Sequence, residues 1–294
     1  NKHFAYANYG IDTDLMDQFE MSPDSGYVQM AGTEESFLHL VELSANATDA
    51  ATYAEIGQLI DVDEYINYMA IQLYVGNWDW PQNNVKGFRN VNGGKFRFVL
   101  FDIDHAFGTT SSFSTFMSKE KYTFDQLYPT SLGRITDQIR FVTLFKNLLQ
   151  NATFRKKFID AYCLVGGSVF QPQRVNTIVN ELVSVARPAM QLTNESPSNT
   201  ANQIKSSLNN RLSTMINTLR NYSAMQLNGV QGQKVKLSSN VESARLLVNG
   251  RDVPMGSFDG TLFPPIELKA KAPRGYSFQG WQDADGKTVY TSDT

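Results

Sequence analysis

The sequence is poor in cysteine and histidine, and this excludes two kinds of site. A single Cys163 cannot form a disulfide within the chain, and its apolar helical surroundings (FIDAYCLV) predict a buried structural thiol rather than a nucleophile. His3, His39 and His105 are scattered without the pairing that zinc ligands need, so no zinc site is expected. For His105, which follows Asp104, we expect a hydrogen-bonded structural role.

Long apolar runs and a strong net charge are also absent. No run of about 18 apolar residues occurs, so we expect no segment that spans a bilayer. A net charge of −3 gives no electrostatic reason to expect nucleic acid or an anionic membrane as a partner. The sequence has no G-x-S-x-G motif, Walker A loop or Cys/His dyad, so the common serine hydrolase and P-loop mechanisms are not expected.

What the sequence does contain is a compact group of acidic and amide residues between Tyr74 and Gly108. Asp79 comes first, the pair Asn83-Asn84 follows, and Asp102 and Asp104 close the group. Trp78 and Trp80 flank the first aspartate. Such a concentration of oxygen-bearing side chains is a candidate site for a hard metal ion.

The local pattern predicts how this stretch folds. Asp61 and Glu64 have the spacing of a capping box, and Gly76 suits a helix C-cap, so a helix is expected to deliver the chain to Asp79. Residues 85–91 and 95–101 read as two strands joined by Asn92-Gly93-Gly94, a strong hairpin signal. A hairpin brings its two ends together, so Asp79 and Asp102 are expected to lie close in space.

The chemistry expected of this group is phosphoryl transfer. Mg²⁺ prefers oxygen ligands and takes one or two carboxylates, with water and phosphates completing its shell. Asp102, at a strand end, suits a metal ligand, and Asn84 offers an amide oxygen. Asp79 lies five residues before Asn84, which is the D-x-x-x-x-N offset of the protein-kinase catalytic loop.

Other interpretations of the same residues remain open. Taken singly, Asp and Asn in turns most often bond their own backbone. The strand ending in FDID resembles the first motif of haloacid-dehalogenase phosphatases, but Ala106 stands where that family has Thr or Val, and helices rather than β/α units follow. D-x-D also occurs in nucleotide-sugar glycosyltransferases, for which no preceding parallel sheet is predicted. A structural calcium loop would crowd its ligands into about a dozen residues, unlike this spacing.

The rest of the chain divides by composition. Residues 1–55 are poorly periodic and are expected to form loops and short helices, and residues 110–130 a long loop. Helical spacing then predicts helices over 139–149, 154–161, 171–193 and 199–221, with Pro188 bending or ending the third. From Asn228-Gly229 onward, short alternating runs and turn residues predict a small all-β module.

The stretch YINYMAIQLYVGN, Asp79 with Asn83-Asn84, the hairpin, and KFRFVLFDIDHAFG together resemble the CotH kinase family of spore-coat-protein-H-like atypical protein kinases. The resemblance is specific over about residues 60–108 and diffuse to about 222. It implies an α+β fold, in which a mostly helical protein-kinase-like catalytic lobe carries a β-hairpin active site and is followed by the small all-β domain. The implied domains are residues 1–225 for the catalytic region and 226–294 for the module.

The resemblance also implies roles. Asp79 would be the catalytic aspartate, Asp102 and Asn84 metal ligands, and Asp104 an auxiliary ligand. The family implies transfer of the γ-phosphoryl group of ATP, with Mg²⁺ or Mn²⁺, to Ser/Thr of secreted or surface proteins. It implies an exported bacterial protein, located at the cell surface, in the periplasm or outside the cell.

One feature departs from a complete kinase. A kinase needs a β-rich N-terminal lobe with a cation on the phosphates, and only 78 residues precede Asp79, without a glycine-rich loop or V-A-I-K-like strand. Because Asn1 is not an initiator methionine, we expect a processed or truncated chain whose N-terminal lobe is absent or incomplete, and which is inactive or impaired alone. The competing interpretation is a catalytically silent surface scaffold or adhesion protein that keeps a kinase-like shape.

The tail PRGYSFQGWQDADGK supports export, because it resembles the Gly-Tyr-x-Phe-x-Gly-Trp β-modules of bacterial surface proteins. Tyr276 and Trp281 within it could bind a glycan. We expect instead that they pack in the core of the small module, because aromatic rings bury much apolar area.

Overall fold

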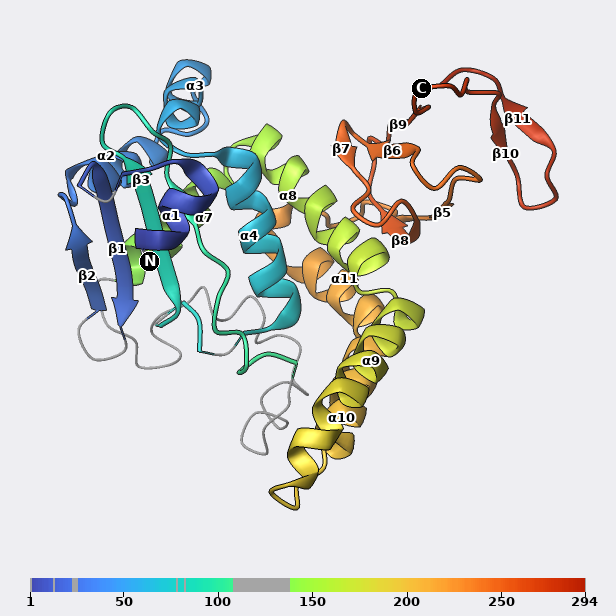
Figure 1. Ribbon diagram of the computed structural model, residues 1–294. Coiled ribbons are helices and arrows are strands. Elements are labelled where there is room, and N and C mark those ends of the chain that lie inside the picture. Colours follow the sequence, from blue (N-terminus) through green and yellow to red (C-terminus); the bar gives the residue numbers. More distant parts are fainter. Residues whose placement is uncertain are drawn as a thin grey trace. The chain divides into compact units, whose positions relative to one another are not determined.

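The computed structural model describes residues 2–12, 14–22, 26–77, 79–81, 83–107 and 138–293 (Figure 1). The chain forms two compact units: the first contains residues 1–158 and 222–226, and the second contains residues 159–221 and 227–294. Within the described parts, none of the helices combines the length and the apolar character that a membrane crossing requires. The architecture is α+β, as expected, with nine α-helices and several small antiparallel sheets among the described residues.

The first unit combines helices with one sheet. Four helices and two strands precede the hairpin, and α7 and the start of α8 follow the segment that is not described. The elements are α1 (Lys2–Tyr9), β1 (Met16–Ser22), β2 (Gly26–Ala31), α2 (Glu35–Ser44), α3 (Ala50–Leu59), α4 (Val62–Val75), β3 (Val85–Asn90), β4 (Arg97–Phe98), α7 (Gln138–Leu148), α8 (Ala152–Leu164) and the short η3 (Ser223–Met225).

The sheet has the order β2-β1-β3-β4, and all neighbours are antiparallel. The expectation of only loops and short helices over residues 1–55 is therefore wrong, because β1 and β2 lie there. Their alternation is hidden by an irregularity in the β1–β2 pairing between Gln18 and Phe19. Asp17 also makes the strand hard to recognise, because an acidic residue is not expected at a buried strand position. Its charge is paired with the guanidinium of Arg89, which is 72 residues away in the sequence but only 2.9 Å away in the structure.

The helix that leads to the acidic group begins and ends as predicted. The Asp61 carboxylate accepts a hydrogen bond from the backbone N–H of Glu64 at 3.1 Å, which satisfies one of the unpaired donors of the first turn of α4. At the other end Gly76 adopts a left-handed conformation with φ of 62°, where a glycine has no Cβ to clash. The α4 helix therefore ends at Val75, four residues before Asp79.

The hairpin after Asn84 is confirmed, with a shorter second strand than expected. The chain turns at residues 91–94, and β3 pairs with β4 only over Arg97 and Phe98, rather than over 95–101. The reason is competition for backbone partners: the N–H of Phe96 donates to the Leu59 carbonyl at 2.7 Å, and its carbonyl accepts from Asp61. One more bond, from the Val99 N–H to the Lys86 carbonyl, continues the pairing.

Aromatic side chains form the core of this unit. Phe19 of β1 lies 4.4 Å from Phe37 of α2 between ring centroids, and Tyr65 of α4 lies 5.1 Å from Phe98. These contacts place α2 and α4 on one face of the sheet. Along the other face runs α1, whose Ala5 packs with Phe88 of β3 (Figure 1). Both faces are therefore covered, and β4 is held where it leads to Asp102.

The helices of the second unit differ from the expectation in one place: the predicted helix over 199–221 is two helices that break at Asn210. The helix expected over 171–193 is confirmed from Pro172 to Gln191, and of the two effects expected of Pro188, ending the helix there does not occur. Cys163 is buried, as predicted. The helical elements of this unit after α8 are η2 (Val165–Val169), a π-helical turn, and α9 (Pro172–Gln191), α10 (Ser198–Asn209) and α11 (Arg211–Asn221).

The residues after 226 form strands without helices, as the change in composition predicts. They make three small sheets with the orders β5-β8, β7-β6-β9 and β10-β11. The strands are β5 (Gln233–Leu237), β6 (Arg245–Val248), β7 (Arg251–Asp252), β8 (Phe258–Leu262), β9 (Leu268–Lys271), β10 (Trp281–Gln282) and β11 (Thr288–Tyr290).

These strands share a compact unit with the helices of residues 159–221, so the contacts divide the chain differently from its composition. Phe258 of β8 packs so closely on η2 that a Cβ added at Gly167 would lie 2.3 Å from its ring. The Asn249 amide donates to the Asp160 carboxylate at 2.8 Å, and the Met255 N–H donates to the Ser168 hydroxyl. Helices and strands here share both apolar and polar contacts.

The expected packing of Tyr276 is wrong. Its side chain is 62 % exposed, although the Trp281 ring contacts Phe278 at 5.7 Å between centroids. The two-stranded β10-β11 sheet is too small to enclose Tyr276, and Tyr290 of β11 is exposed as well.

Candidate functional site

Asp79 lies just beyond the end of α4, and amide groups hold its carboxylate. The Asn83 and Asn84 side-chain amides both donate to Oδ2 of Asp79, at 2.8 and 3.1 Å. Hydrogen bonds to a carboxylate are stronger than those between neutral groups, so two donors on one oxygen fix the orientation of the group. The two asparagines that follow the aspartate in sequence therefore act as its local support.

Asn84 joins the two acidic points, Asp79 and Asp102, although Asp102 lies 18 residues after Asn84 in the sequence. Its amide nitrogen donates to Asp79 and, at 3.3 Å, to the backbone carbonyl of Asp102. The side chain is only 4 % exposed, and the backbone has a φ of 57°. Asparagine is one of the few residues that tolerate this left-handed conformation. Asn84 therefore suits the position for two reasons: its backbone adopts the required φ, and its amide makes both hydrogen bonds.

The backbone of Asp102 is held from two sides. Besides Asn84, the Asn77 amide donates to the Asp102 carbonyl at 3.4 Å and to the Gln72 side chain of α4 at 3.1 Å. Asp102 also has a positive φ, of 50°, which turns the chain sharply after β4. A strained backbone that its surroundings over-determine is typical of functional sites.

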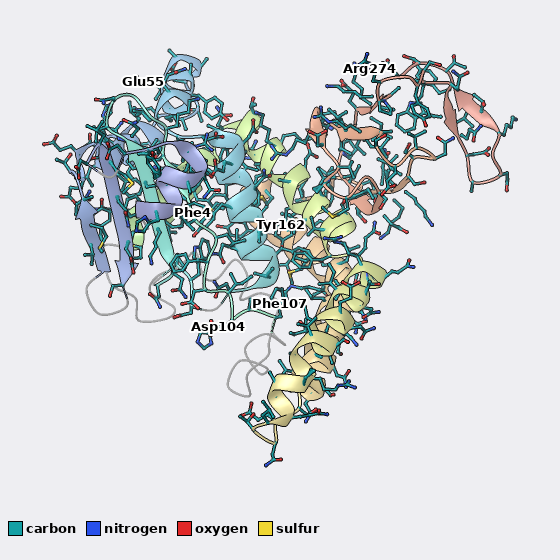
Figure 2. The ribbon with its side chains drawn as sticks, in the orientation of Figure 1. Phe4, Glu55, Asp104, Phe107, Tyr162 and Arg274 are labelled. Atoms are coloured by element: carbon teal, nitrogen blue, oxygen red, sulfur yellow. The ribbon has the colours of Figure 1, made fainter. Side chains whose placement is uncertain are left out.

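The loop after Asp102 is fastened to the end of α4. The Phe107 N–H donates to the Val75 carbonyl at 3.2 Å, and the Ala106 N–H donates to the Ile103 carbonyl at 3.1 Å. Figure 2 shows Asp104 and Phe107 near the C-terminal end of α4. The end of one helix thus anchors both halves of the site: Asp79 through chain continuity, and residues 102–107 through hydrogen bonds.

The acidic side chains of the site repel one another. The pKa of Asp102 is raised above its usual range, first because the surrounding chain removes water from its carboxyl group. The second cause is Asp104, whose carboxyl group hydrogen bonds with that of Asp102 and adds its negative charge. The charge of Asp79 acts in the same direction, and His105 opposes it. Bringing a cation to Asp102 and Asp104 would relieve this repulsion.

The available donors fit a hard divalent cation that shares its shell with a substrate. Asp102 and Asp104 offer carboxylate oxygens. The Asn84 amide nitrogen makes the bonds to Asp79 and to the Asp102 carbonyl, and the amide oxygen takes part in neither of these bonds. Among the described residues, no three His, Cys, Asp or Glu side chains gather in a way that could hold a metal ion alone. Mg²⁺ commonly binds in such incomplete sites, with one or two carboxylates and substrate phosphates.

Sequence reasoning missed two contributors to this region. Asn77 is fully buried and carries the link from α4 to Asp102; a polar residue immediately after a C-cap glycine is the only local sign of that role. Lys86, two residues after Asn84, forms an ion pair with Glu20 of β1 at 3.3 Å. Its ammonium lies 4.3 Å from the ring centroid of Phe101, the residue before Asp102. Because β1 was not foreseen, this pair could not be predicted.

Of the two tryptophans beside Asp79, the structure describes Trp80. Trp78 lies outside the described residues, as does the loop expected over 110–130. Trp80 is fully buried, and its indole N–H donates to the Tyr68 hydroxyl at 2.9 Å, so it belongs to the core beneath the site. Asp79, Asn84, Asp102 and Asp104 are brought to one region, as their spacing predicts.

Comparison with known proteins identifies the family of this chain. The chain is similar to inner spore coat protein H of Bacillus subtilis (strain 168), with 26 % identity over 159 residues. That alignment covers 53 % of this chain and 43 % of the relative, so the chain spans less than half of the relative's length. The family model described as CotH kinase protein matches residues 6–226, about three quarters of the chain. The chain belongs to the CotH kinase family.

Proposed function

We propose that this chain carries the base and metal-binding part of an atypical protein kinase. The reaction is transfer of the γ-phosphoryl group of ATP, in the presence of Mg²⁺ or Mn²⁺, to a Ser or Thr hydroxyl of another protein. The observation that carries the proposal is the Asn84 amide, which links the Asp79 carboxylate to the backbone of Asp102. Phosphoryl transfer depends mainly on positioning and electrostatics, and this link positions the two groups together.

In this proposal Asp79 accepts the proton of the acceptor hydroxyl and orients its oxygen for attack. The Asn83 and Asn84 donors hold one of the Asp79 carboxylate oxygens in a fixed direction. Asp102 and Asp104, with the amide oxygen of Asn84, hold the cation. When bound, that cation would neutralise negative charge on the phosphates. Lys86 is a candidate for an additional phosphate contact, because Glu20 and Phe101 hold it beside the residue that precedes Asp102.

The proposed acceptors are proteins of a bacterial surface layer. Support comes from the relative, which is an inner spore coat protein, and from the resemblance of the tail to surface-protein modules. We therefore propose an exported or surface-associated location.

The test is phosphate incorporation by the purified full-length protein supplied with labelled ATP and Mg²⁺ or Mn²⁺, followed by identification of phosphoserine and phosphothreonine. Asp79→Asn is expected to lower the rate by at least 100-fold, because general-base assistance contributes about 10²–10⁴-fold. Asp102→Asn is expected to reduce both metal-dependent ATP binding and incorporation. Asp259→Asn, an exposed carboxylate of β8, is the matched control and should leave both unchanged. Unchanged incorporation in Asp102→Asn would remove that residue from the proposed metal site.

A second candidate is a scaffold that has the family's fold without turnover. The observation in its favour is the name of the relative, which describes a coat component and names no activity. A scaffold predicts no Mg²⁺-dependent ATP binding, whereas the kinase proposal requires it. Equilibrium binding of ATP with and without Mg²⁺, compared between the unaltered chain and Asp102→Asn, distinguishes the two.

A further inference from the structure

The helix α9 exposes a row of apolar side chains to solvent. Its buried residues are Val175 and Val179. The helix packs beside α10, through side-chain bonds of Asn176 and Asn180, and Figure 1 shows these two helices side by side. A different face remains uncovered. Leu182 and Val185 there are 63 % and 80 % exposed, and the C-cap residue Leu192 is 87 % exposed. We call this row the α9 seam; its members are Ile178, Leu182, Val185, Ala189 and Leu192.

The spacing of the α9 seam is that of a coiled-coil interface. Successive members are separated by four, three, four and three residues, so they lie along one side of the helix over two heptads. Such a seam packs against another helix, because each side chain fills a hole between four residues of the partner. Scattered exposed apolar residues need no explanation, but a continuous row on one face marks an interaction site.

The size of the α9 seam suits a pair of copies. From their exposed fractions, Ile178, Leu182, Val185 and Leu192 present about 400 Å² of apolar side chain per chain. Two copies would bury about 800 Å² from these side chains, which is below the roughly 1,200–2,000 Å² of stable specific interfaces and corresponds to a weak, reversible pair.

The charges around the seam favour an antiparallel arrangement of two copies. Arg174 and Glu181 flank the seam, and Arg187 projects from the opposite side of the helix. Two parallel helices in register would place each flanking charge beside the same residue of the second copy, where like charges repel. In an antiparallel pair with Leu182 opposite Val185 of the second copy, the Arg174 residues lie about 28 Å apart and the Glu181 residues about 8 Å apart along the helix axis, instead of side by side. With so few charges on the helix, a strongly acidic or basic partner has little to pair with.

We propose that the α9 seam is a self-association site, through which two copies of this chain pair by antiparallel packing of α9. Pairing removes the exposed apolar row from water without burying a charge. It uses only residues that are exposed in the single chain, so the fold of each copy is unchanged.

Sedimentation equilibrium of the whole chain over a concentration series tests the pairing. The unaltered chain should form a reversible dimer, and the double variant Leu182→Glu with Val185→Glu should raise the dimer dissociation constant at least 100-fold. The matched control, Ser184→Glu with Gln191→Glu, adds the same charge on another exposed side of the helix and should leave the dimer intact. Circular dichroism shows whether each variant is folded. A chain that stays monomeric up to about 100 µM, or a dimer that survives the seam substitutions, would overturn the proposal.

Cross-linking of single introduced cysteines tests the direction of the helices. Val185→Cys should cross-link rapidly with a short bis-maleimide, because the two copies of this position lie about 5 Å apart along the axis. Leu192→Cys should not, because its copies lie about 25 Å apart along the axis. The buried Cys163 should give no product in the unaltered chain. Efficient cross-linking at both introduced positions would refute the antiparallel arrangement.

Discussion

Replacing Asn84 is the sharpest test of how the candidate site is held together. The amide makes two hydrogen bonds, one to the charged Asp79 and one to the neutral carbonyl of Asp102. A bond to a charged group contributes about 1.5–3 kcal/mol, and one between neutral groups about 0.5–1.5 kcal/mol. Each acceptor keeps another donor, Asn83 for Asp79 and Asn77 for the Asp102 carbonyl. We therefore expect the loss to fall at the low end, about 2 kcal/mol for the side chain.

The backbone contribution can be separated from this value. Because Asn84 has a φ of 57°, Asn84→Ala adds about 1 kcal/mol of left-handed strain, whereas Asn84→Gly does not. The expected decreases in unfolding free energy are about 3 kcal/mol for Ala and about 2 kcal/mol for Gly. Asn83→Ala, which removes one bond to Asp79 and no link to Asp102, should decrease it by about 1 kcal/mol.

Asn84→Asp extends the test to the cation. The new carboxylate has no proton to donate and faces Asp79, so the protein should be less stable than Asn84→Gly at neutral pH without metal. Mg²⁺ should then stabilise Asn84→Asp more than the unaltered chain, because it relieves greater repulsion.

Urea unfolding followed by circular dichroism, with and without Mg²⁺, measures these free energies, and titration with Mn²⁺ measures metal affinity. If Asn84→Gly keeps the stability and the Mn²⁺ affinity of the unaltered chain, Asn84 does not join the two halves of the site, and the reasoning fails.

Three further predictions concern the stability of the two units. Asp17→Ala should lower the unfolding free energy by about 3–5 kcal/mol in urea titrations, because it leaves Arg89 of the sheet largely buried without its carboxylate; a change below about 1 kcal/mol would mean that the ion pair is dispensable. Gly87→Ala should lower the unfolding free energy by about 1–3 kcal/mol, because the new Cβ would lie 2.4 Å from the Phe19 ring. Gly57→Ala in α3, where no atom lies within 4 Å of the new Cβ, should instead raise it by up to about 1 kcal/mol. Equal urea unfolding midpoints for the two variants would contradict this. In the second unit, the hydrogen bond from Arg245 lowers the pKa of Asp252, so the pair stabilises above the ordinary carboxyl range and loses its effect as the pH falls through the lowered pKa. Because both side chains are half exposed, Asp252→Asn should cost less than about 1 kcal/mol at pH 7 and nothing near pH 2, measured by thermal unfolding.

Local signals predicted the elements nearest the site. The Asp61 cap and the Gly76 terminus of α4 depend on atoms within four residues, and the turn at Gly93 depends on one backbone conformation. Such features are written in adjacent residues, so they could be recognised without the fold.

Contacts between distant residues could not be predicted in this way. The strand β1 depends on pairing with β3, and its buried Asp17 bonds with Arg89, 72 residues away. Neither partner shows the other in its local pattern. The break at Asn210 and the continuation of α9 through Pro188 likewise depend on packing that overrides local propensity.

The sequence by itself therefore determined the order of Asp79, Asn84 and Asp102, the hairpin between them and the family to which they point. Only the tertiary structure decided how these residues are joined: Asn84 bridges Asp79 and the Asp102 backbone, and Asn77 ties that backbone to α4. The sequence shows which groups are present and how far apart they lie along the chain. A hydrogen bond between backbone and side chain across 18 residues requires the folded sheet and helix that hold both ends in place.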